Sequence, residues 1–131
     1  MSFSYLGLIT LWDDSKFQEQ DLSDIVEREQ VKGTLSEVKK VQVIVSEKGV
    51  SIQTDQIEDR IQLSSIRTAF TFTDTDDQKT HTSVLVSQPS QDSSLITLHV
   101  IQSIDLSLST RLINQIREIY ENVAEPQDVK L

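Results

Sequence analysis

The chain has 131 residues, no cysteine and a formal net charge of −9 at pH 7, and this length suits one domain that buries most of its apolar surface. The absence of cysteine excludes disulfides, thiolate nucleophiles and cysteine metal ligands, and the scattered lysines and arginines argue against nucleic acid or an anionic membrane as the partner. No apolar run is long enough to span a bilayer and no charged-then-apolar leader is recognisable, so we expect no membrane insertion.

The first predicted element is a strand over about residues 3–12. A short helix over about residues 21–31 follows, with its apolar residues on one face. Asp21 or Ser23 is placed to cap the start of this helix. Gly33 is placed to end it in a left-handed conformation.

From about residue 38 to residue 102 the apolar pattern changes to a period of two, which is typical of strands. Val41, Val43 and Val45 alternate with more polar residues. The turn Ser46-Glu47-Lys48-Gly49 comes next, and a return strand starts at Val50. This pattern predicts a β-hairpin, with Gly49 at a positive φ.

The strand predicted over residues 66–74 is rich in β-branched and aromatic side chains, as strands favour. It is preceded by a break near Thr54 and a short apolar segment from Ile61. Strict alternation places four of its side chains on one side, namely Ile66, Thr68, Phe70 and Phe72.

The acidic run over residues 74–79 is interpreted as a solvated loop, because it lacks the central glycine and distal glutamate of a calcium-binding loop. Two further strands are predicted at residues 83–87 and 95–102. A polar connection through Pro89 joins them.

The C-terminal quarter predicts one amphipathic helix, because its apolar residues recur at 3.6 residues per turn. Residues 1–124 are expected to form a single domain, and residues 125–131 a flexible tail. The predicted fold is mostly β with α: a seven-stranded antiparallel sandwich or partly open barrel, capped by the C-terminal helix, with a short helix between strands 1 and 2. The apolar stripe of the closing helix consists of Leu112, Ile113, Ile116, Ile119, Tyr120 and Val123.

Five segments carry a resemblance. They are Tyr5-Leu6-Gly7 in the first strand, the alternating hairpin over residues 41–52, the segment over residues 61–70, the run Leu98-His99-Val100-Ile101, and the helix end at residues 116–120. In this order they resemble the phosphotyrosine-binding (PTB) domain family, which shares the pleckstrin-homology (PH) superfold. Leucine, isoleucine and tyrosine stand here where that family more often has cysteine, an aromatic residue and phenylalanine.

The resemblance implies a non-enzymatic, cytoplasmic adaptor domain for protein–protein interaction. Its partner is expected to be a protein or peptide, such as a cytoplasmic tail with a motif of the Asn-Pro-x-Tyr or Asn-Pro-x-Phe type. The peptide adds as a strand in the groove between strand 5 and the C-terminal helix. The peptide-binding residues carried over are Ile66, Arg67, Thr68, Ala69, Phe70, Phe72, Ile113, Ile116, Arg117 and Tyr120.

Several interpretations stay open. Arg67 is either a solvated strand charge or a partner for a peptide carboxylate or phosphate, and Tyr120 is either a core aromatic or one wall of the groove. Because no arginine cluster is visible in the sequence, we favour phosphate-independent binding, although a fold could bring Arg67, Arg117 and Lys39 together. The alternative function is a PH-like structural or dimerisation module of a larger assembly, with no peptide groove in use.

The chemistry-bearing motifs of enzymes are missing from the sequence. There is no nucleophile elbow, no Walker loop and no dinucleotide glycine fingerprint, so we expect no catalytic residue and no cofactor. His81 and His99 make a poor zinc site without cysteine, and we expect no metal. Asp13 and Asp14 stand where a phosphoinositide site would need lysine and arginine, which argues against lipid-headgroup binding.

Overall fold

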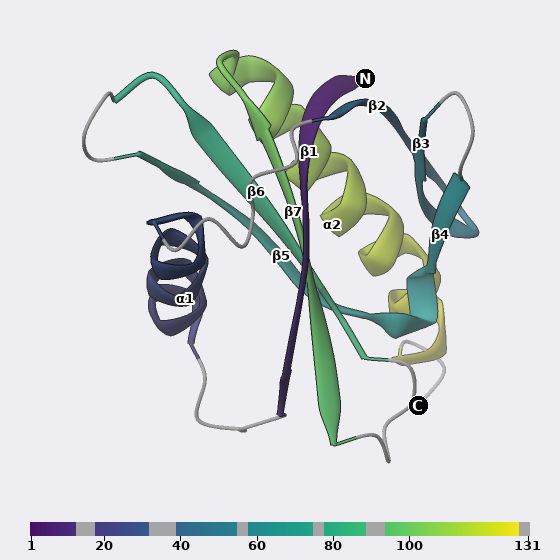
Figure 1. The fold of residues 1–131 in the computed structure, drawn as a ribbon. Helices are drawn as coiled ribbons and strands as arrows, with labels where there is room; N and C mark the ends of the chain where they lie inside the picture. Colours follow the sequence, from purple (N-terminus) through teal and green to yellow (C-terminus); the bar gives the residue numbers. More distant parts are fainter. Residues whose placement is uncertain (13–17, 32–38, 55–57, 75–77, 89–93, 129–131) are drawn as a thin grey trace.

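The computed structural model describes residues 1–12, 18–31, 39–54, 58–74, 78–88 and 94–128. Its elements follow the predicted order of strand, helix, six strands and helix. The expectations for Asp13, Asp14, Gly33 and Pro89 lie outside the described residues. The elements are β1 (Ser2–Trp12), α1 (Glu19–Val31), β2 (Lys39–Ser46), β3 (Gly49–Gln53), β4 (Glu58–Gln62), a 3-10 turn (Leu63–Ser65), β5 (Ile66–Thr73), β6 (His81–Ser87), β7 (Leu95–Ser103) and α2 (Leu106–Asp128) (Figure 1).

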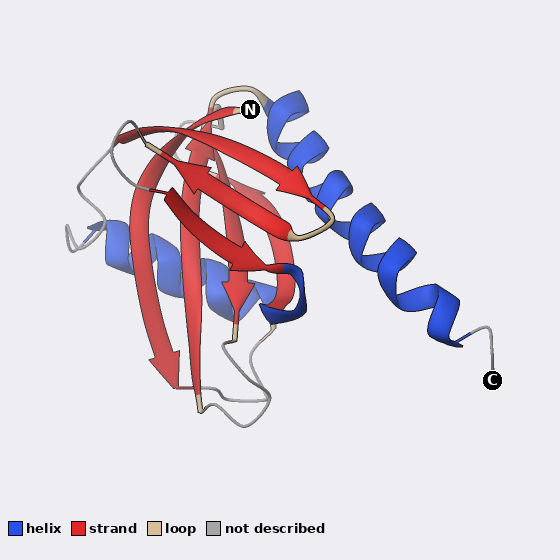
Figure 2. Ribbon diagram, turned by 90° about the vertical axis from the view of Figure 1, so that its right-hand side faces the viewer, coloured by secondary structure: helices blue, strands red, loops and turns tan. Residues whose placement is uncertain are grey.

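The seven strands form one antiparallel sheet in the order β4-β3-β2-β1-β7-β6-β5. The predicted seven-stranded antiparallel fold is therefore confirmed. β1 joins the two parts of the sheet, because its residues Ser2 to Tyr5 pair with β2 while Ser4 to Trp12 pair with β7. Figure 2 shows β2, β3 and β4 turned across the direction of the other strands. The two end strands do not pair with each other, so the sheet stays open.

The two helices lie on opposite faces of the sheet, and each covers its own hydrophobic cluster (Figures 1 and 2). The face under α1 buries Leu22 and Val26 of that helix against β1, β5, β6 and β7. The face under α2 also receives β2, β3 and β4, which fold over it. The buried residues of this second cluster are Phe3, Val41, Val43, Val50, Ile52, Ile61, Ile66, Ala69, Leu85, Ile101, Leu112, Ile113 and Ile116.

Two glycines permit local backbone geometry that other residues resist. Gly7 has a φ of 135° and lies at a β-bulge between Tyr5 and Gly7, where β1 shifts its register against β7. Gly49 has a φ of 139° and pairs with Ser46 across a two-residue turn. Without a Cβ, glycine takes such angles at little steric cost. The predicted hairpin and its glycine are both confirmed.

One prediction about β5 was wrong. A register shift between Ile66 and Thr68 marks a β-bulge against β6, and it breaks the alternation expected from the sequence. Ile66 therefore faces α2, whereas Phe70 and Phe72 face the α1 side and their ring centroids lie 6.4 Å apart. An inserted residue on one strand moves every following side chain to the other face.

The helix starts also differ from the predictions. α1 begins at Glu19, and Asp21 acts from inside its first turn: the Gln18 backbone N–H donates to Asp21 Oδ2 at 2.9 Å. Ser23 is not a cap, since its hydroxyl donates to the Gln20 carbonyl oxygen at 2.9 Å. α2 begins earlier than its apolar stripe, because Asp105 Oδ1 accepts from the N–H groups of two residues in its first turn.

Candidate peptide-binding edge

The sheet has two end strands, and the first of them, β4, is short and charged. It spans five residues, of which Glu58, Asp59 and Arg60 are exposed. Arg60 Nε lies 2.7 Å from Glu58 Oε1, and Ser51 Oγ on β3 donates to the same oxygen at 3.0 Å. Short length and charged side chains are the usual means by which proteins prevent an edge from pairing with another chain.

The other end strand, β5, is longer and nearly uncharged. It spans eight residues with the sequence IRTAFTFT, in which Arg67 is the only charge. Among the strands in the described ranges, β6 is its single partner. The prediction that this strand forms an edge of the sheet beside the C-terminal helix agrees with the fold.

The inner side of β5 is filled by α2. Ile66 and Ala69 of the strand and Ile113 and Ile116 of the helix are all buried in one cluster. Burial of each large side chain contributes roughly 1.5–3 kcal/mol to stability. A guest strand therefore cannot lie between β5 and α2 at this depth, and only the outer rim of the edge is open to pairing.

A side chain of α2 reaches the backbone of β5 at this rim. Arg117 Nη2 donates to the carbonyl oxygen of Ala69 at 3.5 Å. In an antiparallel pair, alternate residues of an edge strand direct their N–H and C=O groups away from the partner strand. Asp74 N–H donates to the Thr80 carbonyl oxygen, so this pair is a hydrogen-bonded one. Ala69 lies five positions earlier in regular register and therefore belongs to the outward set that a guest would use.

The predicted peptide-binding residues do not form one surface. Four of them meet in the α2 cluster, Phe70 and Phe72 lie on the opposite face, and Arg67 and Arg117 are exposed. Thr68 is half-buried, and the side chain of Tyr120 lies outside the described residues. The bulge at the start of β5 divides the set. A bulge inserts one residue without a sequence signature of its own, so alternation alone could not reveal the division.

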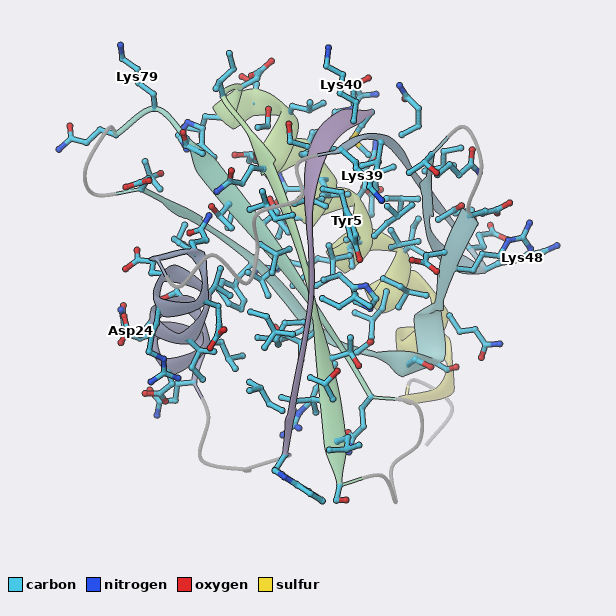
Figure 3. All side chains as sticks on the ribbon, in the orientation of Figure 1. Tyr5, Asp24, Lys39, Lys40, Lys48 and Lys79 are labelled. Atoms are coloured by element: carbon cyan, nitrogen blue, oxygen red, sulfur yellow. The ribbon has the colours of Figure 1, made fainter. Side chains whose placement is uncertain are left out.

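Of the three basic residues that a fold could bring together, only Arg67 and Arg117 lie near each other. Arg117 contacts β5 two residues away from Arg67. Lys39 pairs with Tyr5 at the start of β1, and three strands separate β2 from β5 in the sheet (Figure 3). The three basic side chains therefore do not share one strand edge.

A buried polar group that the sequence did not indicate lies under the β2–β4 part of the sheet. Ser87 Oγ and His99 Nε2 are 3.2 Å apart and both residues are buried. Burial lowers the pKa of His99 to about 4, against the opposing charge of Asp59. Burial and the same carboxylate raise the pKa of Tyr5 to about 12. Sequence could not show this group, because the register of β6 on β7 brings Ser87 to His99.

This Ser–His pair lacks the geometry of a nucleophilic site. Such a site needs a group that orients the other ring nitrogen and an exposed hydroxyl. His99 Nδ1 has no hydrogen-bond partner among the described residues, and neither does Tyr5 Oη. The pair is best understood as a packed, neutral part of the core.

Within the described ranges, no three His, Asp or Glu side chains come together as a set that could hold a metal ion. None of the helices in those ranges combines the length and apolar character that a bilayer crossing requires.

Comparison with known proteins gives no match to any family model and no similar curated protein. The resemblance to PTB domains therefore stays an expectation from the five sequence segments.

Proposed function

We propose that the chain is a non-enzymatic protein-interaction domain that binds an extended segment of a partner by strand addition at β5. One observation carries this proposal: the two end strands of the same sheet differ in length and in charge. β4 carries three charged residues in five, whereas β5 offers eight residues with one charge. An edge strand with so little charge tends to pair with another chain. Main-chain hydrogen bonds to such a strand give the affinity in strand addition.

The proposal includes the motif and the place of action that the PTB resemblance implies. The partner segment is of the Asn-Pro-x-Tyr or Asn-Pro-x-Phe type, in the cytoplasmic tail of another protein, and phosphate is not required. Two arginines at the rim, rather than a larger cluster, support phosphate-independent binding.

An NMR titration tests the proposal. Synthetic peptides with Asn-Pro-x-Phe, Asn-Pro-x-Tyr and its phosphorylated form are added to the isotope-labelled domain. Shifts confined to residues 66–73 and 106–117 are expected, with little preference for the phosphorylated peptide. Shifts only elsewhere, or no binding by any of the peptides, would overturn the proposal.

A matched pair of variants sharpens this test. The N–H of Thr71 belongs to the same outward set as the Ala69 carbonyl, because both lie in regular register two residues apart. Thr71→Pro removes that donor without removing a β6 bond, and we expect it to abolish peptide binding. Thr71→Val keeps the backbone donor and the side-chain shape, so binding should survive. Both variants also lose the bond between Thr71 Oγ1 and Ser83 Oγ, which makes them equivalent in this respect.

The structural alternative has an observation of its own. Leu8, Trp12 and Leu95 are 49%, 73% and 38% exposed, and Trp12 pairs with Leu95 on β7. A module of a larger assembly would use such a face. Sedimentation over a range of concentrations tests self-association through it: Trp12→Ser would dissociate a dimer, and a wild-type monomer at every concentration would exclude dimerisation.

A further inference from the structure

The contact of Arg117 with β5 has the properties of a bond that can be exchanged. Its length of 3.5 Å is at the upper limit for a hydrogen bond, its acceptor is a neutral carbonyl, and Arg117 itself is exposed. Among the side chains that the structure describes, no carboxylate lies within ion-pair distance of Arg117. A bidentate bond to a carboxylate is stronger and shorter than the present one.

The α2 residues that share the side of Arg117 can be followed toward the start of the helix. Positions four, seven and eleven residues before Arg117 share its side of the helix, and they are Ile113, Thr110 and Leu106. Thr110 is exposed and Leu106 is 53% exposed. This side of the helix therefore has an exposed apolar residue near its start and a cationic residue, Arg117, where it contacts β5.

The strand registers fix the direction of this side of the helix. His81 pairs with Thr73 on β5 and with Ser103 on β7, so the end of β5 and the end of β7 lie at the same end of the sheet. α2 begins shortly after Ser103, so Leu106 lies toward Thr73 and Arg117 lies beside Ala69. Of these two positions, Arg117 borders β5, through its bond to Ala69.

The residues of β5 and the α2 positions on the side of Arg117 differ in charge from the molecule as a whole. The chain has a net charge of −9. Neither β5 nor the line of α2 residues from Leu106 to Arg117 on this side carries an acidic residue, whereas Arg67 and Arg117 are cationic. A local cationic rim favours a guest of opposite charge.

We propose that Arg117 is an exchangeable latch that selects guest segments with an acidic side chain next to the residue that pairs with Ala69. In the free protein Arg117 holds the outward carbonyl of Ala69. A guest strand supplies its own N–H to that carbonyl, which releases the guanidinium to bind a carboxylate of the guest. This inference rests on the proposed strand addition at β5 and adds the chemistry of the partner.

The test starts from a library of random 12-residue peptides displayed on phage and selected on the wild-type domain, with Thr71→Pro as the counter-selection. Binders lost on Thr71→Pro are synthesised, and each Asp or Glu is exchanged singly for Asn or Gln. Exchange at one acidic position should weaken binding by about fivefold, which is the size of an exposed ion pair. The peptide with Asn or Gln at that position is called the amide twin of the acidic peptide.

Variants of Arg117 test whether this residue causes the difference in affinity between the acidic peptide and its amide twin. Arg117→Gln should bind the acidic peptide and its amide twin equally, and Arg117→Lys should restore part of the preference as a point charge. A phosphoserine at the acidic position shows whether phosphate replaces the carboxylate. NMR of the Arg117 guanidinium gives a second measurement: its N–H resonances should shift with the acidic peptide and stay in place with the amide twin.

The outcomes separate the two proposals. If no selected peptide is lost on Thr71→Pro, strand addition at β5 fails and the latch fails with it. If peptides bind at β5 but no acidic position is preferred, or if Arg117→Gln keeps the preference, only the latch is overturned.

Discussion

β4 and β5 occupy equivalent places at the two ends of one sheet, yet only one of them carries dense charge. β4 presents Glu58, Asp59 and Arg60 in five residues, and β5 presents Arg67 in eight. Their surroundings differ as well, because α2 packs beside β5 and contacts its backbone through Arg117. The comparison teaches that the side chains of an end strand, rather than its place in the sheet, indicate whether the strand is protected from pairing with another chain.

The largest expected effect comes from the packing that fixes α2 beside β5. Ile116→Ala should lower the free energy of unfolding by about 2–5 kcal/mol, because a fully buried isoleucine leaves a cavity. Ile116 is 3% exposed in the cluster that contains Ala69. Urea unfolding measures the loss, and the exposed Asn114→Ala is the control. Equal stability of the two variants would show that α2 is not anchored through this residue.

Acidification should lower the stability of the domain through the buried His99, whose pKa is influenced by Asp59 on β4. Burial lowers the pKa of His99 to about 4 from the ordinary 6.5, and the β4 residue Asp59 opposes this shift. The unfolded chain therefore binds the proton first, so stability falls as pH drops from 6.5 to 4, by roughly 3 kcal/mol, and this contribution levels off below pH 4.

NMR titration of the His99 ring measures its pKa directly, and unfolding between pH 4 and 7 measures the linked stability. His99→Gln should have a shallower dependence than the wild type, and Asp59→Asn should move the pKa of His99 further down. A ring that titrates near 6.5 would contradict the account of its burial.

A smaller effect is expected at the end of α2 that lies toward Thr73. Asp105→Ala removes the side-chain acceptor for the Ser107 and Leu108 N–H groups, and it should cost about 1 kcal/mol. Asp105→Asn keeps an acceptor and should lose only part of this. Thermal unfolding distinguishes the two, and indistinguishable midpoints for Asp105→Ala and the wild type would argue against the cap.

The smallest effect on stability is expected from removing the charges of β4. This variant tests most directly whether those charges protect the β4 edge. The triple variant Glu58→Thr, Asp59→Thr, Arg60→Thr should unfold at nearly the same temperature but form oligomers at high concentration, because a second edge becomes able to pair. Light scattering detects the oligomers. Asp24→Asn with Arg28→Gln and Glu118→Gln changes the net charge equally on the helices and should stay monodisperse. A monodisperse β4 variant would mean that its charges do not protect the edge.

The sequence predicts the order of the elements well, because periods of two and 3.6 are clear in β2, β3 and α2 and glycine marks the hairpin at Gly49. It also places β5 beside the closing helix through the resemblance. It fails where geometry depends on distant pairing: the bulge near Arg67, which divides the predicted site, and the contact of Ser87 with His99. The sequence indicates Asp21 as a capping residue, but not that it accepts from the Gln18 N–H inside the first turn, because this depends on where the helix begins.

The role of β1 as the joint between both parts of the sheet has a consequence for biosynthesis. Thr10 pairs with Thr97, whereas β2 and β3 find each other across a tight turn. On the ribosome, β1 can form its longest pairing, with β7, only after nearly the whole domain has emerged. Such distant pairing slows folding, so a nascent chain arrested before β7 should remain protease-sensitive, with only pairs of consecutive strands such as β2–β3 and β5–β6 able to form.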